Sequence, residues 1–157
     1  MRSSEYSHIK AINGWSGDWF FAFTNKQYVV EWNAYDPEAN NWHHLPSIPT
    51  AEPHGHHHGF SCVCVCNKFF VMGGFHETFQ GPLFPENKSC ETTDVWMFDP
   101  FKKQWSRRAS MKMPRSWFSC VVMSGKVYVA GGFNCSKRGG VTNAEVYDPV
   151  EDRSVSK

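Results

Sequence analysis

The segment HHGFSCVCVCNKFFVMGGF, residues 57–75, recurs further along the chain as RSWFSCVVMSGKVYVAGGF, residues 115–133. The two segments align without a gap at an offset of 58 residues, and each ends in a glycine pair followed by phenylalanine. These glycine pairs are Gly73-Gly74 and Gly131-Gly132. Self-similarity at a fixed period is typical of repeat architectures, in which each repeat is one supersecondary unit. The sequence therefore predicts a chain built from successive copies of one unit.

A second motif, an aromatic residue followed by Asp-Pro, occurs three times with spacings of 63 and 49 residues. The three copies are Tyr35-Asp36-Pro37, Phe98-Asp99-Pro100 and Tyr147-Asp148-Pro149. A tryptophan, Trp42 or Trp105, stands seven residues after the first two aromatics, whereas the third copy has Ser154 there. In the first copy the apolar run at 20–23 leads into Thr24-Asn25 instead of a glycine pair. The motifs therefore define three repeats, of which the first and the last are degenerate.

Each repeat reads as a meander of short strands. In the middle repeat we predict strands at 59–66, 68–74, 93–99 and 104–109, with turns at Asn67-Lys68 and Asp99-Pro100. In the third repeat we predict strands at 117–124, 126–132 and 143–148, with the chain stopping before a full fourth strand. Apolar side chains alternate onto both faces of 117–124, so we expect neighbouring sheets to cover both faces.

The apolar run into Gly-Gly, the aromatic-Asp-Pro motif, the following tryptophan and a period of about 50 residues together resemble the kelch repeat. This resemblance implies an all-β fold, a partial kelch-type β-propeller of about three blades, each a four-stranded antiparallel meander. The expected organisation is an irregular lead or degenerate strand at 1–18, a degenerate first repeat at 19–49, a second repeat at 50–113 with a long loop insertion at 76–91, and a truncated third repeat at 114–157.

Three repeats are fewer than the roughly four to eight blades that close a propeller. Two explanations stay open. The chain is a fragment whose missing blades lie in a longer polypeptide, or two chains associate to complete one ring.

Composition excludes several classes of partner. Sixteen basic residues stand against fifteen acidic ones, so no basic field indicates nucleic acid. No apolar stretch is long enough to span a membrane or to serve as a signal peptide. The six cysteines lack the spacing of a small disulfide scaffold. We therefore expect a cytoplasmic or nuclear protein with protein partners, and neither nucleic-acid nor membrane partners.

The histidine-rich run at 54–58, followed by Cys62, Cys64 and Cys66, suggests a zinc site at first sight. The repeat alignment instead places Cys62 over Cys120, an ordinary blade position, and no C-x-x-C pair occurs. No nucleophile elbow or phosphate-binding loop is present either. We predict no metal, no cofactor and no enzymatic activity. The distant alternative is a fragment of a copper oxidase related to galactose oxidase, a family that also uses a kelch-type propeller.

In kelch propellers the ligand face is built from loops between strands and from the residues that enter each innermost strand. Carried over by position, the resemblance nominates as partner-binding residues His57, Arg115, Lys137 and Arg138, with Phe79 and Phe84 as aromatic anchors. The last two lie in the 76–91 loop, whose length is typical of loops that are either functional or disordered.

Residues 31–37 and 41–49, EWNAYDP and NWHHLPSIP, resemble the first repeat of plant F-box/kelch proteins. That resemblance implies the substrate-recruiting part of a ubiquitin-ligase receptor. Eighteen residues precede the first clear strand, too few for the helical F-box, so we expect the recruiting half without the coupling half. The alternative is a kelch scaffold or regulatory protein unrelated to ubiquitination.

Overall fold

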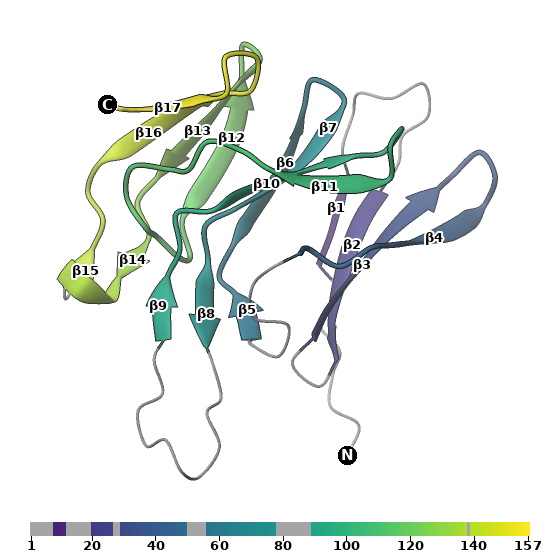
Figure 1. The fold of residues 1–157 in the computed structure, drawn as a ribbon, viewed down its shortest axis with the longest axis horizontal. Helices are drawn as coiled ribbons and strands as arrows, with labels where there is room; N and C mark the ends of the chain where they lie inside the picture. Colours follow the sequence, from purple (N-terminus) through teal and green to yellow (C-terminus); the bar gives the residue numbers. More distant parts are fainter. Residues whose placement is uncertain (1–7, 12–19, 27–28, 50–55, 78–88, 138) are drawn as a thin grey trace, which may run out of the picture.

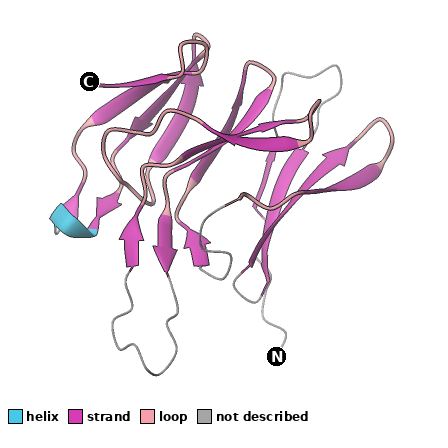
Figure 2. Ribbon diagram, in the orientation of Figure 1, coloured by secondary structure: helices cyan, strands magenta, loops and turns pink. Residues whose placement is uncertain are grey.

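The computed structural model describes residues 8–11, 20–26, 29–49, 56–77, 89–137 and 139–157. These residues form three four-stranded antiparallel sheets that lie side by side as blades, with two smaller sheets at one end (Figure 1). Apart from the short 3-10 helix Cys135–Lys137, the regular structure of this part of the chain consists of strands (Figure 2). The prediction of an all-β fold with four-stranded antiparallel blades is confirmed.

The three blades follow one another along the chain. Blade 1 contains β1 (His8–Ala11), β2 (Phe20–Lys26), β3 (Val29–Asp36) and β4 (Asn41–Leu45). Blade 2 contains β6 (Ser61–Val65), β7 (Lys68–Met72), β10 (Val95–Asp99) and β11 (Gln104–Arg107). Blade 3 contains β12 (Ser119–Met123), β13 (Lys126–Ala130), β16 (Ala144–Asp148) and β17 (Arg153–Ser156). The small sheets are β5 (His56–His58) with β8 (Phe75–Glu77) and β9 (Ser89–Glu91), and β14 (Phe133–Asn134) with β15 (Gly139–Gly140).

Two differences from the predicted strands concern the ends of the repeats. The third repeat has its fourth strand, because β17 pairs with β16 in a register that sets Tyr147 opposite Ser154. This corrects the prediction that the chain stops before that strand. The segment predicted as a loop at 76–91 begins and ends in strands, since β8 pairs with β9. Its middle, 78–88, lies outside the described residues.

The Asp-Pro motif forms the same turn in all three blades. Each aspartate accepts two main-chain N–H hydrogen bonds through its Oδ1 atom, from the residues two and three positions further on. The residue four positions after each aspartate has a positive φ, at Asn40, Lys103 and Asp152. A side-chain acceptor of this kind stabilises a tight turn, and in each blade the outer strand begins directly after that turn. The motif is therefore a structural signature of the repeat.

The glycine pairs end the second strand of blades 2 and 3. Gly73 and Gly74 have φ values of +58° and +104°, and a Cβ atom on Gly74 would lie 2.6 Å from Nε2 of His57. Only glycine takes up such a conformation so close to a neighbouring side chain. The first repeat has no glycine pair, and there β2 runs on to Lys26 and forms a longer hairpin with β3.

Apolar side chains fill the two spaces between the blades. Blades 1 and 2 share a core in which the rings of Phe21 and Phe69 stack with their centroids 4.5 Å apart. Trp32 packs against the edge of Phe69 in the same core. Between blades 2 and 3 lies a second core, where Phe70 contacts the ring of Tyr147 edge-on. Burying a side chain of this size contributes about 2 to 3 kcal/mol, so these two layers hold the blades together.

The outer face of blade 3 remains open. The register places Val121 opposite Tyr128 and Met123 opposite Lys126, on the side that faces away from blade 2. Val121 and Met123 are 58% and 55% exposed. No described element of these three blades covers this face, and the prediction that a neighbouring sheet covers it stays a prediction. Within the described residues, no helix is long and apolar enough to cross a bilayer.

Candidate functional site

The small sheets lie at one end of blades 2 and 3 (Figure 1), and the predicted binding residue His57 belongs to one of them. His57 lies in β5 and its ring stacks on that of His76 in β8, with centroids 4.2 Å apart. Its Nε2 atom is hydrogen-bonded to the main-chain oxygen of Gly73 at 2.9 Å. Burial, and then the charge of His76, lower the pKa of His57 to about 4. His57 is therefore a neutral, half-buried residue at physiological pH.

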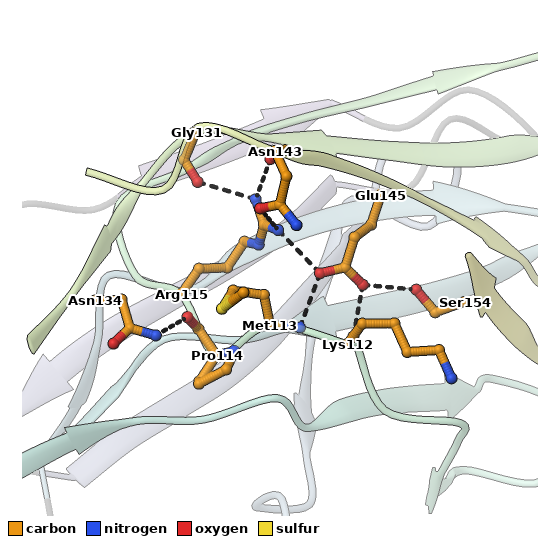
Figure 3. A network of polar contacts seen from close by, with 9 residues as sticks. All are labelled: Lys112, Met113, Pro114, Arg115, Gly131, Asn134, Asn143, Glu145 and Ser154. Atoms are coloured by element: carbon orange, nitrogen blue, oxygen red, sulfur yellow. Dashed lines mark hydrogen bonds and ion pairs between the residues drawn. The ribbon is translucent and has the colours of Figure 1, made fainter. Parts of the chain in front are cut away.

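Arg115 does not reach the surface. Its side chain is 0% exposed, and its guanidinium forms a buried ion pair with Glu145 at 2.9 Å (Figure 3). Further hydrogen bonds run from the same guanidinium to the main-chain oxygens of Gly131 and Asn143. The structure thus corrects the prediction that Arg115 contacts a partner. A buried guanidinium needs such partners to offset its lost hydration, and blade 3 supplies them.

In the third repeat, Glu145 bonds to the residue that stands at the tryptophan position. Its carboxylate accepts hydrogen bonds from the main-chain N–H groups of Lys112 and Met113, at 2.6 and 2.9 Å. It also accepts one from the hydroxyl of Ser154, the residue that stands at the tryptophan position (Figure 3). This network ties the linker between blades 2 and 3 to blade 3 itself. Its central side chains, Arg115, Glu145 and Ser154, are buried and have a structural role.

Among the described residues at this end, the most exposed aromatic residue is Trp117, which sequence reasoning missed. Its side chain is 61% exposed, and its ring packs beside those of His58 and Phe75, with centroids 5.7 and 5.9 Å away. The backbone N–H of Trp117 donates to the main-chain oxygen of Gly59 at 2.7 Å. We call Trp117, His58 and Phe75 the Trp117 cluster. Large, exposed and rigidly held aromatic residues are typical anchors of protein interfaces.

One signal for Trp117 exists in the sequence. The repeat alignment sets Trp117 over Gly59, and both residues have a positive φ, of +50° and +66°. An indole at a position that glycine occupies in the other repeat indicates a special role, because a non-glycine residue is strained there.

The structure does not describe the side chains of the remaining nominated residues. Phe79, Phe84 and Arg138 lie outside the described residues, and of Lys137 only the backbone, at the end of the 3-10 helix, is described. Their role in binding stays a prediction. In the described part of the chain, no group of three or more His, Cys, Asp or Glu residues is arranged to hold a metal ion.

Comparisons with known proteins agree with this architecture. A model of the kelch motif matches residues 56–112 and 114–154. An F-box/kelch-repeat protein of Arabidopsis thaliana is 50% identical over 98% of this chain. A second Arabidopsis F-box/kelch-repeat protein is 36% identical over 77% of it. A human kelch repeat and BTB domain-containing protein is 32% identical over 75% of it.

This chain is shorter than those relatives, spanning 39%, 34% and 19% of their lengths. Among solved structures, that of YjhT superimposes with a TM-score of 0.74 at 15% identity, over 98% of this chain and 50% of the YjhT chain. That likeness supports the propeller fold of the three blades. Because the kelch motif matches most of two successive repeats, this chain belongs to the kelch-repeat family.

Proposed function

We propose that the chain is the protein-binding part of a substrate receptor for a ubiquitin ligase, and that the Trp117 cluster lies in its binding surface. The observation that supports this most is the exposed indole of Trp117, which packs beside the rings of His58 and Phe75 and stands on a backbone with a positive φ. A rigid aromatic side chain loses little conformational entropy when it is buried by a partner. The names of the F-box/kelch relatives support the link to ubiquitination.

Site-specific crosslinking tests the binding surface. A photo-crosslinking residue replaces Trp117 in one version of the protein, and Phe101 in a matched control. Phe101 is also exposed, but it lies in the β10–β11 turn at the opposite end of blade 2. We expect the Trp117 version to capture a defined protein in extracts of its source cells, and the Phe101 version to capture none of it. Equal capture by both versions would rule out this surface.

Protein turnover tests the link to ubiquitin. If the captured protein is a substrate, it accumulates when cells are depleted of the receptor, and proteasome inhibition produces the same increase. Capture without any change in the abundance of the captured protein would instead identify the chain as a kelch scaffold or regulatory protein. The two outcomes separate the binding function from the ligase function.

A further inference from the structure

A row of three side chains crosses the small sheet of blade 2. The register sets His58 in β5 opposite Phe75 in β8, and Phe75 opposite Glu91 in β9. Residues directly opposite one another in an antiparallel sheet project from the same face, with Cβ atoms roughly 5 Å apart. Glu91 is therefore the next neighbour of the Trp117 cluster on that face.

Glu91 is a carboxylate with unused bonding capacity. Its side chain belongs to a residue that is only 8% exposed, and its Oε2 atom accepts a hydrogen bond from the main-chain N–H of Cys135 at 3.0 Å. Its Oε1 atom is buried and has no hydrogen-bond partner among the described residues. Among the described residues, no lysine or arginine forms an ion pair with Glu91. A buried carboxylate without a cation is costly, so it favours the arrival of positive charge nearby.

The aromatic rings beside Glu91 favour the same charge. A cation within about 6 Å of the face of a tryptophan or phenylalanine is attracted by the negative potential of that face. A guanidinium can stack on an indole while its charge is balanced by a carboxylate a few ångströms away. Because the field of Glu91 acts through the protein interior, where screening is weak, the cation does not need to touch the carboxylate.

We infer that Trp117, Phe75 and Glu91 form a subsite for a basic side chain, arginine or lysine, of the bound protein. This inference rests on the proposed binding function and specifies the partner's side chain as positively charged. The rings supply the contact surface and the carboxylate selects the charge. Phe75 links the two parts of the subsite, because its ring contacts that of the exposed Trp117 and it stands opposite the buried Glu91 in the sheet.

Nuclear magnetic resonance of the indole N–H groups tests the subsite without knowledge of the partner. The probes are acetyl-arginine amide and acetyl-citrulline amide, which have nearly the same shape but differ in charge. The Trp117 signal is assigned from the Trp117→Phe variant. We expect arginine to shift this signal with at least about fivefold higher affinity than citrulline, the discrimination that an exposed cation–π contact and a nearby charge provide. Equal affinity of the two probes would refute the inference.

The Glu91→Gln variant then tests the carboxylate. Glutamine retains an oxygen that can accept the hydrogen bond from Cys135, so we expect the fold to persist, which the other six of the seven tryptophan signals report. Arginine should now bind no better than citrulline does. Undiminished arginine binding would refute the role of Glu91, and if the variant does not fold, the comparison of the two probes on the unmodified protein still decides the question.

The outcomes keep this inference apart from the proposed function. If a partner crosslinks at Trp117 but arginine and citrulline bind equally, the protein binds partners at this surface without selecting a basic side chain. If arginine is preferred but no protein crosslinks at Trp117, the subsite exists and the proposed function is wrong.

Discussion

The indole of Trp105 in blade 2 donates a hydrogen bond to the main-chain oxygen of Pro46, which follows the last strand of blade 1, at 2.7 Å. The same indole packs on Phe98 of its own blade and on Trp32 of blade 1, with ring centroids 5.2 and 5.6 Å away. Trp42 holds the equivalent repeat position in blade 1, yet it is 52% exposed. Trp105 therefore connects blades 1 and 2, whereas Trp42 connects blade 1 to no other described blade.

This contrast predicts different effects for the same substitution. Trp105→Phe removes the hydrogen bond to Pro46 and part of the packing, and should lower the free energy of unfolding by about 1 kcal/mol or more. Trp42→Phe should change it by less than about 0.5 kcal/mol, because the ring is exposed. Urea denaturation of both variants measures the difference. Equal losses would mean that Trp105 does not join the blades in solution.

The buried pair of Arg115 and Glu145 leads to a second prediction. Glu145→Ala leaves the guanidinium buried without its counter-charge, so we expect a loss of about 3 to 5 kcal/mol in unfolding free energy. The double variant Arg115→Met with Glu145→Leu should lose less, because no uncompensated charge remains.

The exposed pair of Glu151 and Arg153 is the matched control. Glu151→Gln should cost less than about 1 kcal/mol, since solvent screens an exposed ion pair. Thermal or urea unfolding of the three variants would check this order. A double variant as unstable as Glu145→Ala would contradict the proposed cause.

The blades could be predicted from the sequence because their signals are local. The aspartate of each motif accepts hydrogen bonds from the next few residues, and the glycine pair takes up positive φ values. Both motifs therefore determine the structure of a single turn of the chain. The repetition of these motifs then indicated how many blades to expect. The extent of β17 was missed because Ser154 replaces the tryptophan that marks the outer strand.

The site was harder to predict because it depends on contacts between distant residues. Arg115 points inward because Glu145, thirty residues later, receives it, and the alignment with His57 carried no information about that partner. Glu91 gains its place beside Phe75 only through the pairing of β8 with β9, on either side of a long segment. Of these residues, only Trp117 had a signal in the sequence, because the repeat alignment sets its indole over Gly59.

Backbone strain gives a third prediction. Gly74→Ala would place a Cβ atom 2.6 Å from Nε2 of His57 and 3.0 Å from the main-chain oxygen of His58, at a φ of +104°. Gly125→Ala is the control, because Gly125 also has a positive φ, of +72°, but its Cβ atom would meet nothing within 4 Å. We expect Gly125→Ala to cost about 1 kcal/mol from conformation alone, and Gly74→Ala to cost clearly more, as measured by the midpoint of urea unfolding. The reverse order would show that the glycine pair is not held against β5.

The pKa of His57 predicts how stability changes with pH. In the folded protein this pKa is lowered to about 4, from 6.5, by burial and then by the charge of His76. Between these two values the unfolded chain binds a proton that the folded protein does not, so stability must fall as the pH is lowered from about 6.5 to about 4. One such proton gives a slope of at most about 1.4 kcal/mol per pH unit.

Two measurements check this sign and its origin. Titration of the His57 ring by nuclear magnetic resonance should give a midpoint well below that of an exposed histidine, and the His57→Asn variant should show a shallower loss of stability over the same pH range. The difference between the pH profiles of the variant and the unmodified protein then measures the contribution of His57 itself. A midpoint for His57 near 6.5 would mean that its ring is hydrated and that β5 does not pack against Gly73 and Gly74 as the structure has it.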